Sequence, residues 1–555
     1  MLFRSASARG NGKGLGCTPW SGNVARSVAG LSTFAAMFSG SFFLTLAFAA
    51  ALLAPILGSA QTRSAERGVA GFDSSRPAER RQHRPAPLKE LRDDIDALLS
   101  TPEWNGAHVG VCVMSLDGGE LVYRRNDDAL FTPASVQKLF TTAAALAIFG
   151  PEHQFTTTVT LDGSLQPSGE FVGNVILKGG ADPTWSSAYG VDAAAMFDEW
   201  ADVLDSLGIR SIKGNIIGDD DMFDDVPYAP GWAWDDLPWA YAPQVGSIAL
   251  YDNAVTVAVT PPSNDAEPPG VRIHPETEYV RVIPSIRVLD STGVTALTPL
   301  RDPSSNVIEL SGTLANMTAA DTVTVRLSVD NPTAYTLWHV RAALQRRGIR
   351  FRGALLDVDD VNDVVADDRT QVVIRHSSMP LKDIVAVINQ RSHNLGAEML
   401  LKAMGWQQGE GSWDRGVDVV RAVLRREGVG TAVAIADGSG LSRLNLCTPH
   451  QVATLLARAQ KATWGSAFRN SLAVPGQVGT LRRRMIGSRA ENAVRAKTGS
   501  MNNVSTLAGY VTTRDGETLA FAVMMSNFIA PQSMAHNLQD PVCMRLASFT
   551  RKLAP

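Results

Sequence analysis

The feature that most constrains how this 555-residue sequence can fold is a change in residue pattern that begins near residue 155 and reverses near residue 376. Between these points, short runs of β-branched residues such as QFTTTVTLDG and DTVTVRLSVD are separated by Gly, Pro, Asn and Asp. This pattern is typical of strands joined by turns. We therefore expect one α/β domain, formed by residues 88–155 and 376–555, that is interrupted by one or two mainly β inserted domains over residues 156–375.

The two outer segments carry both helical and strand patterns. In the first, LKELRDDIDALLS predicts an amphipathic helix, and HVGVCVMSLDGGELVYRRN predicts two strands joined by a Gly-Gly turn. In the second, helical patterns occur in LKDIVAVINQRSHNLGAEMLLKAMG, GVDVVRAVLRREG and TPHQVATLLARAQ. They are followed by the strand-like STLAGYVTTRDGETLAFAVMMSN and by a last helix near PVCMRLASFTRKL.

The first 60 residues have the layout of a secretory signal. The stretch from Ser27 to Thr62 has no charged side chain, and before it stand four basic residues and no acidic one: Arg4, Arg9, Lys13 and Arg26. Gly58-Ser59-Ala60 provides a small-x-small cleavage site before Gln61. The uncharged stretch is also long enough to span a bilayer, so an uncleaved membrane anchor is the alternative.

Both alternatives predict an exported chain, periplasmic or elsewhere in the extracytoplasmic envelope. Residues 61–87, rich in Arg, Ser and Pro, are expected to form a flexible linker between the signal and the folded body. Removal of residues 1–60 would take the formal charge from −4 to −8, so the composition argues against nucleic-acid binding. The cysteines at 112, 447 and 543 allow one disulfide at most and predict neither a disulfide framework nor a metal cluster.

The stretch FTPASVQKLFTTAAALAIFG places a serine and a lysine three residues apart at the start of an apolar helix. Thr132 is expected to cap this helix, so that Ser135 and Lys138 lie in its first turn. Residues three apart lie on neighbouring sides of a helix, so the amine can approach the hydroxyl and act as the base for a serine nucleophile. The alternative is a structural serine beside a lysine that extends to solvent.

Two further motifs follow in the chain. In QRSHNLGAEMLL, Ser392 and Asn394 stand at the boundary of two helical segments, where a serine can pass protons and an asparagine can bind a substrate carbonyl. In VRAKTGSMNN, Lys497-Thr498-Gly499 is expected to begin a strand of a β hairpin. The amide of Ser500 can pair with that of Ser135 as an oxyanion hole. The alternative for Ser392 or Asn394 is helix capping, and the alternative for Lys497 is a solvated lysine on a strand.

The order S-x-x-K, S-x-N, K-T-G resembles the serine enzymes that recognise penicillins, which are the penicillin-binding proteins and the class A and related β-lactamases. The separation of 257 positions from Ser135 to Ser392 makes the chain similar to class C low-molecular-mass penicillin-binding proteins of the DacB type, the D-alanyl-D-alanine carboxypeptidase/endopeptidases. The resemblance covers roughly residues 88–550 and rests on these phrases: PASVQKLFTT, GGADPT, APGWAWDD, SHNLGAEMLL, DGSGLSRLNLCTP and AKTGS.

The resemblance implies a serine acyl-transfer enzyme that acts on peptidoglycan peptides ending in D-Ala-D-Ala, or on their cross-links, and that is inhibited by β-lactams. Ser135 would be the acylated nucleophile, Lys138 its base and Ser392 a further catalytic residue. The implied substrate-binding residues are Asn394, Lys497, Thr498, Gly499 and Ser500. It assigns no role to His393, the middle residue of the second motif, and it implies no metal or organic cofactor.

Two other functions compete with this interpretation. A β-lactamase needs fast deacylation, and the sequence offers no dedicated glutamate for it, because Glu398 is expected to pack or pair locally. A non-catalytic peptidoglycan-binding scaffold would have no need of three intact motifs. A further hypothesis concerns GDDDMFDD, whose carboxylates, from Asp219 to Asp225, can face the ammonium group of a diamino acid, although a solvated turn is the simpler reading.

Overall fold

The computed structural model of the chain describes residues 87–552, except 263–266, 290–292, 316–320, 362–369 and 431. The predicted signal or anchor over residues 1–60 and the predicted linker, apart from Pro87, lie outside the described residues. Within the described part of the chain, no helix is both long and apolar enough to cross a membrane.

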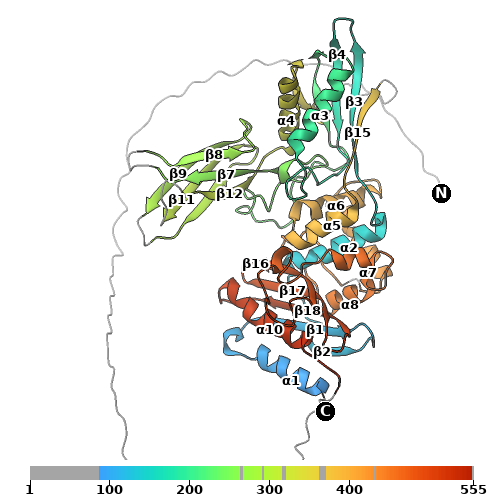
Figure 1. Cartoon of the computed structure of the whole chain (residues 1–555), viewed down its shortest axis with the longest axis vertical. Helices are drawn as coiled ribbons and strands as arrows, with labels where there is room; N and C mark the ends of the chain where they lie inside the picture. The colour runs from blue at the N-terminus through green and yellow to red at the C-terminus, as the bar shows by residue number, and fades with distance from the viewer. Residues whose placement is uncertain are drawn as a thin grey trace, which may run out of the picture. The chain divides into compact units, whose positions relative to one another are not determined.

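Strands from the two ends of the chain form one five-stranded sheet (Figure 1), in the order β16-β17-β18-β1-β2. These strands are Val494–Met501, Val504–Thr512, Thr518–Ser526, His108–Ser115 and Leu121–Arg125. The central pairing joins β1 to β18 in antiparallel register from His108 opposite Ser526 to Ser115 opposite Leu519. The predicted hairpin over residues 108–125 and the predicted strands near the C-terminus are therefore confirmed as members of the same sheet.

Both faces of this sheet are covered, which explains why its strand β18 is a nearly continuous apolar run. Along β18, Phe521, Val523 and Met525 pack into a core with the helices α1 (Pro87–Leu99) and α10 (His536–Ala547). The alternating residues Ala522 and Met524 pack into a second core on the opposite face. The period of two along the strand thus divides its side chains between two hydrophobic layers.

The second core is mainly helical. It is formed around α2 (Gln137–Phe149), α6 (Asn394–Trp406) and α8 (Pro449–Ala459), with α5 (Leu381–Arg391) and α7 (Trp413–Arg426). Ala143 and Ala144 of α2 are fully buried, so the alanine-rich sequence of this helix allows its neighbours to approach closely. A short helix, α9 (Gly465–Asn470), completes this layer.

The segment between the two halves begins and ends with paired strands. β3 (Thr156–Leu165) runs antiparallel to β15 (Thr370–Ser377), with Thr156 opposite Ser377. The chain therefore leaves the helical layer and returns to it at neighbouring points. An inserted domain needs this closeness of its ends, and we propose residues 156–375 as its limits.

The described residues of the segment form a seven-stranded sheet and two three-stranded sheets. In the large sheet, β3 and β15 are joined by β4 (Glu170–Lys178), β5 (Ser211–Lys213), β6 (Ile216–Asp219), β13 (Arg350–Arg352) and β14 (Leu355–Asp357). One small sheet contains β9 (Arg281–Leu289), β10 (Ala296–Arg301) and β11 (Val307–Ala315). The other contains β7 (Ala254–Thr260), β8 (Gly270–His274) and β12 (Val323–Ser328).

Two helices of this segment were not predicted from the sequence. These are α3 (Ala193–Ser206) and α4 (Pro332–Arg347), and each is capped by an acidic or amide side chain, Asp192 and Asn331. The helix α4 buries Thr333, Thr336 and His339 together with apolar residues, so its buried face has no clear apolar period in the sequence. The β-type runs on either side of both helices therefore dominate the sequence pattern of this segment.

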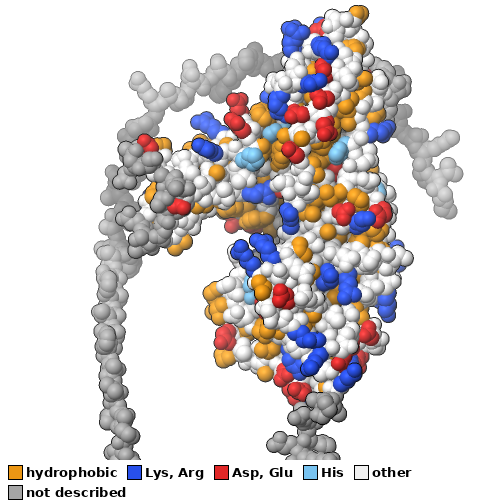
Figure 2. All heavy atoms as spheres, viewed as in Figure 1, with side chains coloured by type: hydrophobic (Ala, Val, Ile, Leu, Met, Phe, Trp, Pro, Cys, Tyr) orange, Lys and Arg blue, Asp and Glu red, His pale blue; other side chains and the backbone are white. Residues whose placement is uncertain are grey.

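The three described cysteines, Cys112, Cys447 and Cys543, are all buried and free. The sequence allowed one disulfide among them, and the fold forms none. The face of the molecule in Figure 2 carries basic and acidic side chains that are interspersed. This mixture agrees with a sequence that has no large excess of either sign.

Candidate active site

Ser135 lies in a 3-10 turn, Ala134–Val136, which leads directly into α2. The prediction that Thr132 caps this helix is wrong, because no side chain caps either the turn or the helix. The extra turn displaces the start of α2 to Gln137, too far along the chain for Thr132 to reach its free amides. Ala134 has a left-handed φ of 46°, a backbone conformation that is often found at functional sites.

Lys138 Nζ is 3.1 Å from Ser135 Oγ, as the spacing of three predicts. The lysine is fully buried, and two further oxygens surround its nitrogen. Asn394 Oδ1 lies at 2.6 Å and the carbonyl oxygen of Ser439 at 2.7 Å. An ammonium group can donate to all three oxygens, whereas a neutral amine can donate to two and accept the proton of the serine hydroxyl.

A buried turn over residues 437–440 presents the Ser439 carbonyl to Lys138. Glu398 Oε1 and Oε2 accept hydrogen bonds from the amides of Ser439 and Gly438, both at 2.8 Å. Asp437 accepts from the amide of Gly440 at 2.7 Å and from Trp232 Nε1 at 3.0 Å. The prediction that Glu398 pairs locally is therefore confirmed, and its carboxylate holds the turn that orients Lys138.

Burial dominates the electrostatics of both site lysines. It lowers the pKa of Lys138 to about 7, against the opposing effects of Glu398 and Asp437. Burial, followed by the positive charge of Lys138, holds the pKa of Lys497 well below its ordinary value. A substrate carboxylate beside Lys497 would favour its charged form again.

The second motif connects the two lysines. Ser392, at the end of α5, accepts a hydrogen bond from Lys497 Nζ at 2.9 Å through its hydroxyl. Asn394, the first residue of α6, accepts from Lys138 and donates through Nδ2 to the carbonyl oxygen of Tyr241 at 2.7 Å. Hydrogen bonds therefore join the second motif to the first through Asn394 and to the third through Ser392.

The third motif lies inside β16, which is one of the two edge strands of the five-stranded sheet. Lys497 is the fourth residue of this strand, so the prediction that the motif begins the strand is wrong by three residues. Pairing with β17 starts earlier because Val494 already bonds opposite Val511. Thr498 Oγ1 donates to Thr480 Oγ1 at 2.7 Å, and Gln532 Nε2 donates to Ser500 Oγ at 2.7 Å.

Gly499 allows β16 to approach the serine turn closely. A Cβ atom at this position would overlap the hydroxyl of Thr506 and would lie 2.9 Å from the Ser135 nitrogen. The Ser135 amide therefore lies beside the Gly499–Ser500 segment, as an oxyanion hole formed by the Ser135 and Ser500 amides would require.

We expect Gly499→Ala to lower the rate of covalent labelling by benzylpenicillin by about 100-fold, because a displacement of about 1 Å at Ser135 is enough for such a loss. The second-order rate of labelling measures this effect. Gly118→Ala is the matched control, since its Cβ would make only an ordinary contact of 3.6 Å with Ser115 Oγ. Equal labelling rates for the two variants would contradict the close approach of β16 to the turn that carries Ser135.

Sequence reasoning missed several residues that shape the site. Thr480 and Gln532 lie outside every motif, so no sequence pattern selects them. Tyr241 contributes only its backbone carbonyl, so its residue type carries no signal. Asp437 and Ser439 belong to the phrase DGSGLSRLNLCTP, which was noted as a family feature but was given no role. The two glycines of this phrase are the signal of a tight turn that sequence analysis could have used.

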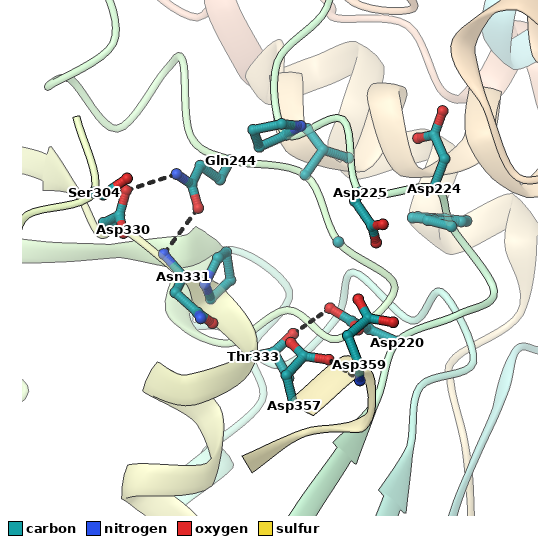
Figure 3. Close-up of a pocket in the computed structure, with 15 residues that line it drawn as sticks. Asp220, Asp224, Asp225, Gln244, Ser304, Asp330, Asn331, Thr333, Asp357 and Asp359 are labelled. Atoms are coloured by element: carbon teal, nitrogen blue, oxygen red, sulfur yellow. Dashed lines mark hydrogen bonds between the residues drawn. The ribbon is translucent and has the colours of Figure 1, made fainter. Parts of the chain in front are cut away.

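The acidic segment after β6 lies in the inserted region. Asp220, Asp224 and Asp225 line a cavity of about 290 Å³ together with Asp357 and Asp359 (Figure 3). Lys178 and Lys402 form ion pairs with two carboxylates of the segment, Asp219 at 3.0 Å and Asp224 at 2.5 Å. The hypothesis that these carboxylates face a diamino acid stays a prediction.

Among the described residues, one group of three metal-binding side chain types lies together: Cys112, Asp127 and His450, with donor atoms within 4.8 Å of one another. The closest sulfur contact is 4.0 Å, from Cys112 Sγ to His450 Nδ1. Burial raises the pKa of Cys112 to about 12, which favours the thiol over the thiolate that metals bind. Cys112 of this group lies on β1. In the sheet, β17 and β18 lie between β1 and β16, the strand that carries the third motif.

Comparison with known proteins gives one consistent result. The sequence profile of the D-Ala-D-Ala carboxypeptidase 3 (S13) family matches residues 91–549. A D-alanyl-D-alanine carboxypeptidase of Actinomadura sp. (strain R39) is 36% identical over 490 residues, which cover 85% of this chain and 87% of the relative. The D-alanyl-D-alanine carboxypeptidase DacB of Haemophilus influenzae is 26% identical over 82% of this chain and 92% of its own length.

The fold has a solved counterpart. The crystal structure of penicillin binding protein 4 (dacB) from Haemophilus influenzae superimposes with a TM-score of 0.71 at 25% sequence identity, over 80% of this chain and 97% of that chain. The predicted fold class, an α/β penicillin-recognising domain with an inserted region, is thereby confirmed.

Proposed function

Because the chain belongs to the D-Ala-D-Ala carboxypeptidase 3 (S13) family, we propose that Ser135 is its acylated nucleophile and that Lys138 activates it. The protein is a serine peptidase and a D-Ala-D-Ala carboxypeptidase. The observation that carries the residue assignment is the 3.1 Å contact between Lys138 Nζ and Ser135 Oγ, made by a fully buried lysine with a lowered pKa. Burial makes the neutral amine available near neutral pH.

Acylation begins when the neutral amine of Lys138 accepts the hydroxyl proton of Ser135. The serine oxygen forms a bond to the carbonyl carbon of the penultimate D-alanine, and the amides of Ser135 and Ser500 stabilise the oxyanion. The C–N bond then breaks, and the proton on Lys138 passes to the leaving amine. Asn394 and the Ser439 carbonyl keep the amine of Lys138 directed at Ser135 through this step.

Deacylation returns the enzyme to its starting state. Water adds to the ester carbonyl, the peptide leaves as a carboxylic acid, and the proton returns to Ser135 Oγ. Ser392 lies against Lys497 Nζ and provides a hydroxyl that can transfer protons at this step. Lys497, Thr498 and Gly499 bind the terminal carboxylate of the substrate, and that carboxylate favours the charged form of Lys497.

The substrates of this reaction are peptidoglycan peptides that end in D-Ala-D-Ala. Cross-linked peptides offer the same carbonyl with a different leaving amine, so we include endopeptidase activity in the proposal. β-Lactams place a strained amide at the same position and would acylate Ser135. Since peptidoglycan lies outside the cytoplasm, the proposal requires export, which agrees with the signal predicted over residues 1–60.

Mass spectrometry of the purified protein after brief exposure to benzylpenicillin tests this proposal. We expect a stable adduct on Ser135, followed by D-alanine release from wall peptides in a second assay. An adduct that forms and is rapidly lost would favour the β-lactamase alternative. A folded protein that forms no adduct would favour the scaffold.

The pH dependence of acylation tests the role of Lys138. Because only its neutral form can accept the serine proton, we expect the acylation rate to rise about tenfold per pH unit below the pKa of about 7 and to stop rising above it. The second-order rate with benzylpenicillin, measured between about pH 5 and pH 9, gives this profile. Circular dichroism at each pH verifies the fold, and a flat profile would contradict the assignment.

A further inference from the structure

His393 caps the helix that carries Asn394. Its Nδ1 accepts a hydrogen bond from the backbone amide of Gly396 at 3.0 Å. Caps of this type are usually Ser, Thr, Asp or Asn, whose short side chains reach only their own helix. An imidazole has a second nitrogen at the far side of its ring, so it can form the cap and also contact another element.

The contacts of His393 define its tautomer. Because Nδ1 accepts the Gly396 amide proton and also lies 3.1 Å from the Tyr189 hydroxyl, which can donate to it, the ring proton of neutral His393 lies on Nε2. That nitrogen is 3.0 Å from Asp252 Oδ1, so the imidazole donates to the carboxylate. The side chain of His393 is only 11% exposed and that of Asp252 only 5%, so water competes little for this bond.

Asp252 belongs to the inserted region and is held rigidly there. Three consecutive residues, Tyr251, Asp252 and Asn253, have left-handed φ values of 53°, 63° and 52°. Such a run of non-glycine residues is strained and persists only where surrounding contacts fix it. Arg326 fixes the carboxylate from the other side, with Nη2 at 2.7 Å from Asp252 Oδ2.

We propose that His393 is a positioning residue for acylation and that its bond to Asp252 makes the inserted region part of the catalytic machinery. His393 lies between Ser392 and Asn394, so a shift of its backbone moves the oxygen that accepts from Lys497 and the oxygen that accepts from Lys138. The hydrogen-bonded pair His393–Asp252 thus transmits the rigidity of the inserted region to the second motif. This inference rests on the proposed function, because it concerns the same site.

Two substitutions separate the cap from the contact with Asp252. In His393→Asn, the side chain oxygen can replace Nδ1 at the cap but is too short to reach Asp252. In His393→Gln, the terminal amide can replace Nε2 and donate to Asp252, but the cap is lost. At the other end, Asp252→Asn keeps an oxygen that accepts from His393, whereas Asp252→Ala removes it.

We expect His393→Asn and Asp252→Ala each to lower the second-order rate of acylation by benzylpenicillin about tenfold to 100-fold. The loss should fall on the acylation step, with little change in the noncovalent affinity. His393→Gln and Asp252→Asn should stay within about threefold of the wild-type rate. The double variant His393→Asn/Asp252→Ala should be no slower than the slower single variant, since both changes remove the same contact between His393 and Asp252.

Asp192→Ala is the matched control, because Asp192 caps α3 in the same inserted region through the amides of Ala194 and Ala195. Its rate should equal that of the wild type. The proposal is overturned if His393→Asn acylates as fast as the wild type, or if the losses of the two single variants multiply. Wild-type protein that forms no adduct would instead contradict the proposed function.

Amide hydrogen exchange of residues 392–396 provides a readout that does not depend on chemistry. We expect faster exchange in His393→Asn and Asp252→Ala than in the wild type, and in Asp252→Ala than in Asp252→Asn. Unchanged exchange in both variants would overturn the positioning role even if the protein proves inactive.

Discussion

Ser135→Ala protein is expected to form no covalent adduct with benzylpenicillin and to release D-alanine from wall peptides at least about 10,000-fold more slowly than the wild type. The reason is that the proposed reaction passes through an ester on Ser135 Oγ. The remaining contacts bind the substrate without providing an alternative nucleophile, because Lys138 and Ser392 hold their polar atoms in hydrogen bonds to neighbouring residues. Intact-protein mass spectrometry and an assay for free D-alanine measure the two effects.

The fold should survive this change, since alanine removes a single hydroxyl from the 3-10 turn. Ser392→Ala is the informative comparison, because it removes a hydroxyl from the same site but leaves the nucleophile. We expect that variant to form the adduct on Ser135, although more slowly. An adduct of unchanged mass and rate in the Ser135→Ala protein would contradict the assignment of the nucleophile.

Lys138→Met is expected to lower the acylation rate about 1,000-fold while the protein remains folded. Methionine keeps most of the volume of the buried lysine but offers no lone pair to accept the Ser135 proton, and general base catalysis is worth about this factor. The substitution also removes a buried amine whose desolvation is costly. Rapid-quench measurement of acylation and a thermal unfolding curve test the two parts of the prediction.

Lys402→Met is the matched control for this variant. Lys402 is another fully buried lysine, on α6, and it pairs with Asp224 and packs over the ring of Trp413 at 4.2 Å. The control should lose stability, because it leaves Asp224 without its partner, but it should acylate within about threefold of the wild-type rate below its unfolding temperature. Equal losses of acylation in both variants would show that burial of a lysine matters rather than its contact with Ser135.

The two buried lysines of the site constrain each other. Lys138 must lose its proton to act as a base, whereas Lys497 needs its proton to bind a carboxylate. Burial lowers the pKa of both groups, and the charge of Lys138 lowers that of Lys497 further. A neutral Lys138 and a substrate carboxylate each favour a charged Lys497, so substrate binding produces the charge distribution that the reaction needs.

The sequence by itself determined the parts of this protein that depend on local spacing. The three-residue spacing of Ser135 and Lys138 predicts the contact between their side chains, because helical geometry fixes the distance between such positions. The strand-like pattern of STLAGYVTTRDGETLAFAVMMSN predicts the strands β17 and β18. The return of helical patterns after residue 376 predicts the second helical segment, since periodicity is a local property of the chain.

Only the tertiary structure decided which distant groups surround these residues. The site contains the backbone carbonyls of Ser439 and Tyr241, which no sequence pattern predicts, because a carbonyl oxygen has the same chemistry in every residue. It also contains the hydroxyl of Thr480, which lies outside every motif. His393 illustrates the same limit. Its sequence position assigns it no role, and its contact with Asp252 exists only because the fold brings a strained segment of the inserted region to the start of α6.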